Sequence, residues 1–146
     1  MIFDNTLLLS DQQAITADAA STNTIDLIAT GSPFGGAPIV KDVGRTANVP
    51  LAIVVTEAFN NLTSLQVQVQ TSPDNSTWTT IVSGMSVPLG TLTSGYSFKV
   101  IDSLPEGTSA RYVRLYYDIT GTAPTTGKIT AGVVAARQSN YSYGGR

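Results

Sequence analysis

The chain has 146 residues and a formal net charge of −2, and it contains neither cysteine nor histidine. Their absence excludes disulfides, thiol nucleophiles, the usual zinc sites and catalysis by Ser-His-Asp or Cys-His arrangements. The eight basic residues are scattered singly, so no phosphate-binding patch for nucleic acid is predicted. The length predicts one domain over residues 1–146.

No stretch of the sequence approaches the ~20 apolar residues that a membrane-spanning helix needs. The first nine residues carry no basic side chain, so no signal peptide is predicted either. We therefore expect a protein that is made in the cytoplasm and does not bind membranes.

The N-terminal part of the chain predicts short, weak strands. Apolar and β-branched residues favour extended backbone at Leu7–Leu9, Ala14–Thr16 and Asn23–Ala29. Ser10 and Gln13 have the S-x-x-Q spacing of a capping box, which opens helices. Because β-branched residues follow at once, we predict one helical turn there at most.

A long segment without hydrophobic periodicity follows, residues 31–50 (GSPFGGAPIVKDVGRTANVP), with four glycines and three prolines. Structureless loops of this length are uncommon in compact domains and are usually functional. Two interpretations stay open. The segment is either a surface loop that covers one end of the domain, or an arm whose Phe34, Ile39 and Val40 contact another subunit.

The middle of the chain carries the clearest strand patterns. Leu65–Thr71 alternates strictly between apolar and polar residues, which predicts a half-buried strand with Leu65, Val67 and Val69 facing inward. Leu51–Thr56 is a continuous apolar run, short enough for a strand that is covered on both faces.

Two less regular patterns follow. Thr77–Val82 alternates loosely and predicts a strand with Trp78, Thr80 and Val82 on one face. A weaker strand is predicted at Tyr96–Ile101.

The last third of the chain predicts two more strands. Arg111–Ile119 places Val113, Leu115 and Tyr117 on one side, and Ile129–Ala135 completes the series. About eight strands separated by Gly- and Pro-rich turns are typical of a β-sandwich, so we predict an all-β fold.

The chain ends in a tail, residues 138–146 (QSNYSYGGR). Tyr141 and Tyr143 lie too close to a free end to be buried within their own domain. The tail is therefore either disordered or a contact arm that uses these two tyrosines, since tyrosine is favoured at interfaces.

No motif predicts catalysis or cofactor binding. The sequence has no glycine-rich phosphate loop and no carboxylate pair that we would name for glycoside hydrolysis. Asp74 and Asn75 could help to hold a calcium ion, but they lack the EF-hand spacing and are typical of a hairpin turn. We expect no enzymatic activity, no cofactor and no metal.

Two segments, Leu65–Trp78 (LQVQVQTSPDNSTW) and Ala110–Tyr116 (ARYVRLY), resemble elements of discoidin-type carbohydrate-binding sandwiches. In that family these residues belong mainly to the scaffold. The resemblance therefore implies that Trp78 fills the core and that an arginine braces the sheet. Emptying such a buried aromatic site costs roughly 3–5 kcal/mol.

A broader resemblance covers most of the chain. Leu8–Thr16, Ser21–Leu27, the Gly- and Pro-rich loop and the strands at Val67–Trp78 and Arg111–Ile119 follow one another in a familiar order. The order is similar to that of the head decoration (cement) proteins of tailed bacteriophages, of the jelly-roll type found on podovirus-like capsids. The resemblance implies a single jelly-roll β-sandwich of about eight antiparallel strands, without enzymatic activity or cofactor.

This resemblance also implies a structural virion protein on the capsid exterior, assembled in the host cytoplasm, that stabilises contacts between major capsid subunits. Its expected partners are the major capsid protein and further copies of itself, as a homodimer or homotrimer. Two alternatives stay open: a carbohydrate-binding module on a tail or surface protein, and a head-completion or tail protein present in few copies. The contact residues that we expect come from the loop and the tail: Phe34, Ile39, Val40, Tyr141 and Tyr143.

Overall fold

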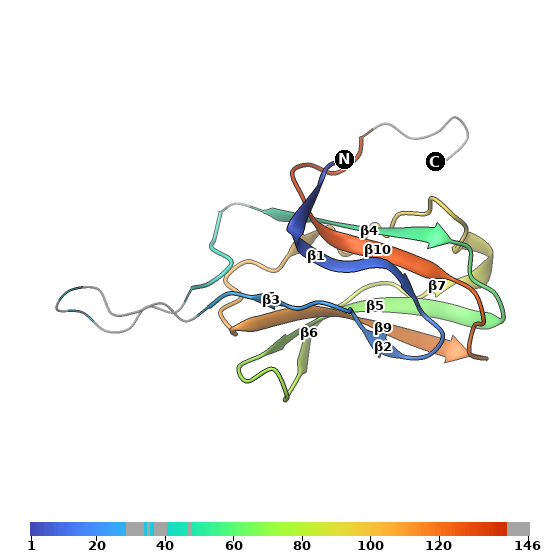
Figure 1. Cartoon of the computed structure of the whole chain (residues 1–146), viewed down its shortest axis with the longest axis horizontal. Helices are drawn as coiled ribbons and strands as arrows, with labels where there is room; N and C mark the ends of the chain where they lie inside the picture. The colour runs from blue at the N-terminus through green and yellow to red at the C-terminus, as the bar shows by residue number, and fades with distance from the viewer. Residues whose placement is uncertain (29–33, 35, 37–40, 47, 140–146) are drawn as a thin grey trace.

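The computed structural model describes residues 1–28, 34, 36, 41–46 and 48–139. Its strands form two antiparallel sheets that pack face to face as a β-sandwich (Figure 1). One sheet has the order β1 (Phe3–Ala14), β10 (Lys128–Val134), β4 (Val49–Glu57) and β8 (Ser103–Leu104). The other has the order β2 (Ala19–Ala20), β9 (Tyr112–Gly121), β5 (Leu62–Ser72) and β6 (Thr79–Ser83). In addition, β3 (Ile25–Asp26) pairs with β9, and β7 (Val87–Pro88) pairs with β5. A 3-10 turn, η1 (Leu89–Thr91), follows β7.

The strand order is that of a jelly roll. β2 and β3 pair with different parts of β9 and act as one interrupted strand, and β6 and β7 do the same along β5. Counted this way, the described part of the chain has eight strands. The four-stranded sheet holds the first, eighth, third and sixth of them, and the six-stranded sheet the second, seventh, fourth and fifth. This order confirms the predicted all-β jelly-roll sandwich of about eight antiparallel strands.

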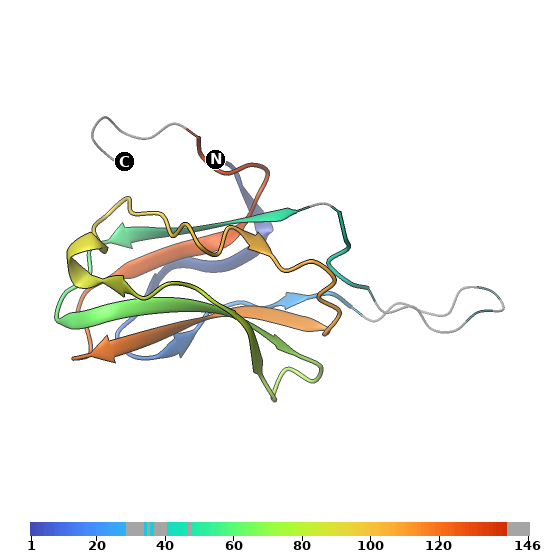
Figure 2. The ribbon, with the colours of Figure 1, turned by 180° about the vertical axis from the view of Figure 1, so that it is seen from behind.

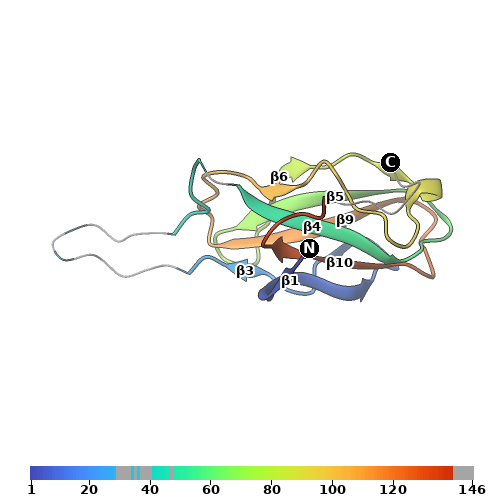
Figure 3. The same ribbon diagram turned by 90° about the horizontal axis from the view of Figure 1, so that it is seen from above.

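The core lies between the sheets, where β4 and β10 cross over β5 and β9 (Figure 3). The alternation predicted for β5 is confirmed, because Leu65, Val67 and Val69 are buried and the intervening glutamines face outward. β9 repeats the pattern with Leu115 and Tyr117 on its buried side. β5 and β9 pair along nearly their whole length, so these two strands form the base of the core.

The segment between η1 and β8 replaces the weak strand predicted at Tyr96–Ile101. It runs along the edge of β4, on the side of the sandwich that Figure 2 turns to the viewer. The Val55 N–H donates to the Tyr96 carbonyl at 2.9 Å, the Phe98 N–H donates to the Ile53 carbonyl at 3.0 Å, and one isolated bridge adds to them. The prediction of a regular strand is wrong, but the segment does cover this edge of β4.

The S-x-x-Q segment forms no helical turn, which agrees with the prediction of one turn at most. Ser10 and Gln13 lie in β1, where the pairing with β10 shifts register three times. The Ser10 hydroxyl donates to Gln13 Oε1 at 2.7 Å and lies 2.7 Å from the hydroxyl of the buried Tyr117. Gln13 also donates to the Ala20 carbonyl and accepts from the Thr22 N–H. The two residues therefore tie β1 to the six-stranded sheet.

Three predicted boundaries at the N-terminal end differ from the observed ones. The strand predicted at Leu7–Leu9 is the centre of the longer β1, and the separate strand at Ala14–Thr16 is absent because β1 ends at Ala14. Of the predicted strand Asn23–Ala29, only Ile25–Asp26 pairs, and Ala29 lies outside the described residues.

The loosely alternating segment Thr77–Val82 does not present one face. β6 begins after Trp78, and its pairing with β5 shifts register next to Val82. Thr80 consequently points outward while the side chain of Val82 packs against the core. Trp78 is half-buried and does not belong to the core, so the predicted position of this residue is wrong.

Candidate functional site

Among the residues that the structure describes, no group of three or more His, Cys, Asp or Glu side chains could hold a metal ion. Surface carboxylates pair with cations instead: Asp26 lies 2.9 Å from Arg111, and Glu57 lies 2.7 Å from Lys128. Hydrogen bonds from these cations lower the pKa of both carboxyls. Side chains that could contact a partner gather at two other places, the outer face of the six-stranded sheet and an apolar pocket at its edge.

The outer sheet face consists of the side chains on β5, β6 and β9 that point away from the core, and its centre is a network of amides. Gln68 donates to Gln66 Oε1 at 3.2 Å and accepts from the Thr80 hydroxyl at 3.0 Å. Gln70 accepts from Arg114 Nε at 2.9 Å. These groups therefore satisfy one another within the same chain.

Trp78 precedes β6 and lies beside the outer sheet face, against Arg114 of β9. The Arg114 guanidinium lies 3.9 Å from the centroid of the Trp78 ring and 6.0 Å from that of Tyr116. Its partial burial between the rings lowers the pKa of Arg114, although an arginine in a protein remains charged. The resemblance to discoidin-type sandwiches implied a Trp78 in the core, but the tryptophan is instead one partner of a cation–π contact on the surface.

Asp74 is committed to the turn between β5 and β6. Its carboxylate accepts from the backbone N–H groups of Thr77 and Ser76 at 2.8 and 3.0 Å, and from the Ser72 hydroxyl at 2.8 Å. These hydrogen bonds, led by the one from Thr77, hold the pKa of Asp74 far below its usual range. The segment is a hairpin turn, as the sequence indicated.

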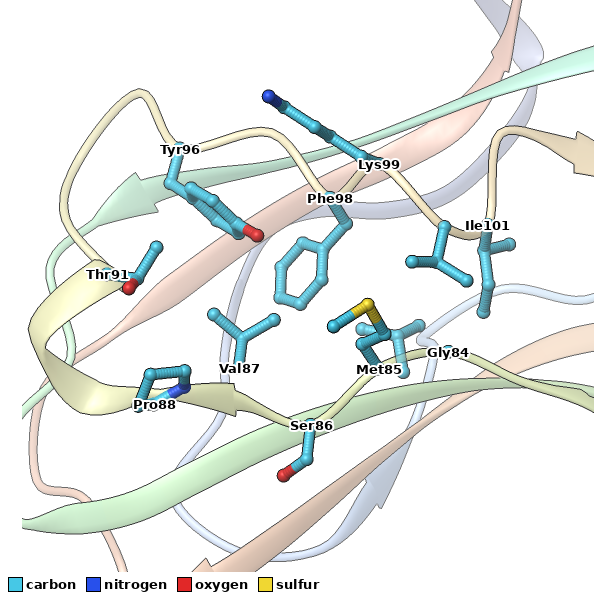
Figure 4. A pocket seen from close by; sticks show the side chains of 12 residues that line it. Gly84, Met85, Ser86, Val87, Pro88, Thr91, Tyr96, Phe98, Lys99 and Ile101 are labelled. Carbon is cyan, nitrogen blue, oxygen red and sulfur yellow. The ribbon is translucent and has the colours of Figure 1, made fainter. Parts of the chain in front are cut away.

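The apolar pocket has a volume of about 310 Å³ and opens between β7 and the segment that runs along β4 (Figure 4). Val87 and Phe98 point toward each other across it, and the rings of Tyr96 and Phe98 meet edge to face at 5.2 Å. Burial raises the pKa of the Tyr96 phenol. Met85 and Val100 are 66% and 50% exposed beside the opening. The full wall consists of Val67, Gly84, Met85, Ser86, Val87, Pro88, Thr91, Tyr96, Phe98, Lys99, Val100 and Ile101.

The pocket exists because its two walls are fixed by different sheets. On one side, the Gly84 N–H donates to the Val67 carbonyl at 2.8 Å, and a Cβ at Gly84 would lie only 2.9 Å from that oxygen. Glycine therefore lets this wall approach β5. On the other side, Tyr96 and Phe98 are hydrogen-bonded to β4. The side chains between the two walls do not fill the space that these anchors leave.

The residues predicted to contact a partner are not brought together by the described structure. Phe34 is fully exposed, and it is the most exposed of the large apolar side chains that the structure describes. Ile39, Val40, Tyr141 and Tyr143 lie outside the described residues. Sequence reasoning missed the pocket because all of its wall except Val67 comes from residues 84–101, which show no regular hydrophobic period.

The fold and these surfaces define a β-sandwich of the jelly-roll class. In the part of the chain that the structure describes, no helix is long and apolar enough to cross a membrane. The model of the Bbp16 family matches residues 9–136, from within β1 to just beyond β10, and the chain belongs to this family. No curated protein matches the sequence.

Proposed function

We propose that this chain is a capsid decoration (cement) protein, a structural virion protein that binds the outer surface of an icosahedral phage head. It stabilises contacts between major capsid subunits without catalysing a reaction. Its partners are the major capsid protein and further copies of itself, as a homodimer or homotrimer, and neither nucleic acid nor a membrane takes part. The jelly-roll fold, the family membership and the order of sequence segments support this proposal.

The observation that carries the proposal is the full exposure of Phe34 on the loop at residues 31–50. Burying such a side chain at an interface stabilises a complex by roughly 1.5–3 kcal/mol. A contact of this size is weak in a single copy. Many copies on a symmetric lattice strengthen one another through effective concentration, so a few such side chains per copy are enough for a cement protein. Ile39 and Val40 of the loop and Tyr141 and Tyr143 of the tail are the other proposed contacts.

The test measures binding to icosahedral heads assembled from the major capsid protein of the phage that carries this chain. Phe34→Ser should lower the affinity about 10-fold or more, as expected for a buried aromatic anchor. Ile81→Ser is the matched control, because Ile81 is a 41% exposed apolar residue on β6, away from the loop. If the unmodified chain does not bind these heads, the proposed function is wrong. If both variants bind equally, Phe34 is not a contact.

Carbohydrate binding is a second candidate function, and the position of Trp78 favours it. The indole ring of Trp78 offers a stacking surface, and Arg114, which contacts both this ring and Gln70, links it to the glutamine amides that can bond hydroxyl groups. Trp78 is the single tryptophan of the chain, so its fluorescence reports directly on this place. A saturable change on titration with oligosaccharides would support the second candidate, and no change across a broad panel would contradict it.

A further inference from the structure

The last described residues leave the sandwich at the rim of the apolar pocket. Arg137 donates from Nη2 to the Phe98 carbonyl at 2.8 Å, and its Nη1 lies 3.7 Å from the Asp102 carboxylate. Phe98 is part of the pocket wall, and Asp102 follows the wall residue Ile101. The start of the C-terminal tail is therefore held next to the pocket by one hydrogen bond and one ion pair.

The tail is long enough to return to the pocket. The residues that the structure describes end at Ser139. Tyr141 and Tyr143 follow Arg137 by four and six residues. At about 3.3 Å per extended residue, these tyrosines reach roughly 13 and 20 Å from Arg137. We propose that the pocket binds a tyrosine ring of this tail, from Tyr141 or Tyr143 of the same copy.

The chemistry of the pocket suits a tyrosine. Its depth is apolar, with Val87 and Phe98 facing each other, while Tyr96 presents a further ring to an incoming aromatic group. A tyrosine ring gains edge-to-face contacts there and can keep its hydroxyl at the opening, in water. The same ring would cover Met85 and Val100, which are exposed apolar residues. Thioether sulfur also contacts aromatic rings favourably.

In the free chain no capsid competes for Tyr141 and Tyr143, so binding of a tyrosine in the pocket does not depend on the proposed function. The sequence provides the reporters for a test of this binding, since it has no cysteine and only two methionines, Met1 and Met85. A nitroxide is attached through Gly145→Cys, and the methionine methyl groups carry ¹³C. We expect the Met85 methyl signal to be lost with the oxidised nitroxide and recovered after reduction.

The matched control carries the same label together with Tyr141→Ser and Tyr143→Ser, and it should keep the Met85 signal. A Met85 signal that persists in the labelled chain overturns the proposal, as does an equal loss in the control. A mixing experiment distinguishes a tail of the same copy from the tail of a second copy. Nitroxide-labelled chains at natural isotope abundance are mixed with ¹³C-methyl chains that lack the nitroxide. Loss of the Met85 signal in that mixture means that a second copy fills the pocket, which also overturns it. No capsid is present, so these outcomes leave the head-binding test untouched.

Discussion

β5 borders two regions, a regular pairing with β9 on one side and an irregular edge on the other. Toward β9 its pairing is regular from Ser64 to Ser72, and the outward amides bond to one another. Beyond Gly84 the chain touches β5 only through short pairings, and apolar side chains such as Met85 face solvent. In the regular region, the backbone groups and the outward amides find their hydrogen-bond partners within the same molecule. An irregular edge leaves apolar surface uncovered, and such surface is what a further chain segment or partner can bury.

The largest expected effect tests the regular region. Leu115→Ala removes a fully buried side chain of β9, and the cavity should lower the free energy of unfolding by about 2–5 kcal/mol. Val100→Ala at the irregular edge, where the side chain is half exposed, should change it by less than about 0.5 kcal/mol. Urea unfolding measures both. Equal losses would mean that the irregular edge is as tightly packed as the core.

Gly84 marks the boundary between the two regions. Gly84→Ala forces a Cβ against the Val67 carbonyl, so we expect a loss of about 1–3 kcal/mol from the shift of one pocket wall. Gly90→Ala is the control, because a Cβ at Gly90 meets no atom within 4 Å. Thermal and urea unfolding of the two variants compare the sites. A neutral Gly84→Ala would show that this wall moves freely away from β5.

Trp78 tests whether the outer sheet face contributes to stability. Trp78→Ala removes a half-buried ring and its cation–π contact with Arg114, and we expect a loss of about 1–2 kcal/mol. This is less than the 3–5 kcal/mol that a core position implies. A measured loss of about 3–5 kcal/mol would indicate that Trp78 is buried in the core.

The smallest effect concerns the polar contact inside the regular region. Tyr117→Phe removes the hydroxyl next to Ser10, which should lower stability by about 0.5–1.5 kcal/mol at neutral pH. Burial raises the pKa of Tyr117 above its ordinary value of about 10, so the unfolded chain releases this proton first as the pH rises. Stability from the neutral phenol is complete below pH ~10 and declines above it. Urea unfolding from pH 8 to 11 should show a shallower decline for Tyr117→Phe, and identical slopes would contradict the assignment.

Sequence patterns predicted the fold correctly where the residues of one strand alone determine which of its sides is buried. The period of two in β5 and β9 identified their buried sides, because a strand alternates whatever its partner. The contacts of the S-x-x-Q segment could not be read from the sequence, because the Ser10 hydroxyl meets Tyr117, which lies 107 positions away. Trp78 was misplaced because a register shift in the β5–β6 pairing cannot be read from either strand alone.

The candidate site was less predictable than the fold. Phe34 was selected as an apolar residue in a long loop, and its side chain is indeed exposed. The pocket required knowledge that β4 holds Tyr96 and Phe98 while β5 holds Gly84. These anchors belong to opposite sheets, so no local pattern indicates the space between them.

The pairing of β1 with β10 has a consequence for how the protein is made. β1 finds its partner only when residues 128–134 have left the ribosome, so the four-stranded sheet cannot be completed before β10 has emerged. Until then, β1 is a nascent strand with unsatisfied backbone groups and an apolar side. Closure of the sandwich therefore waits for β10, and it joins two strands that lie far apart in the sequence.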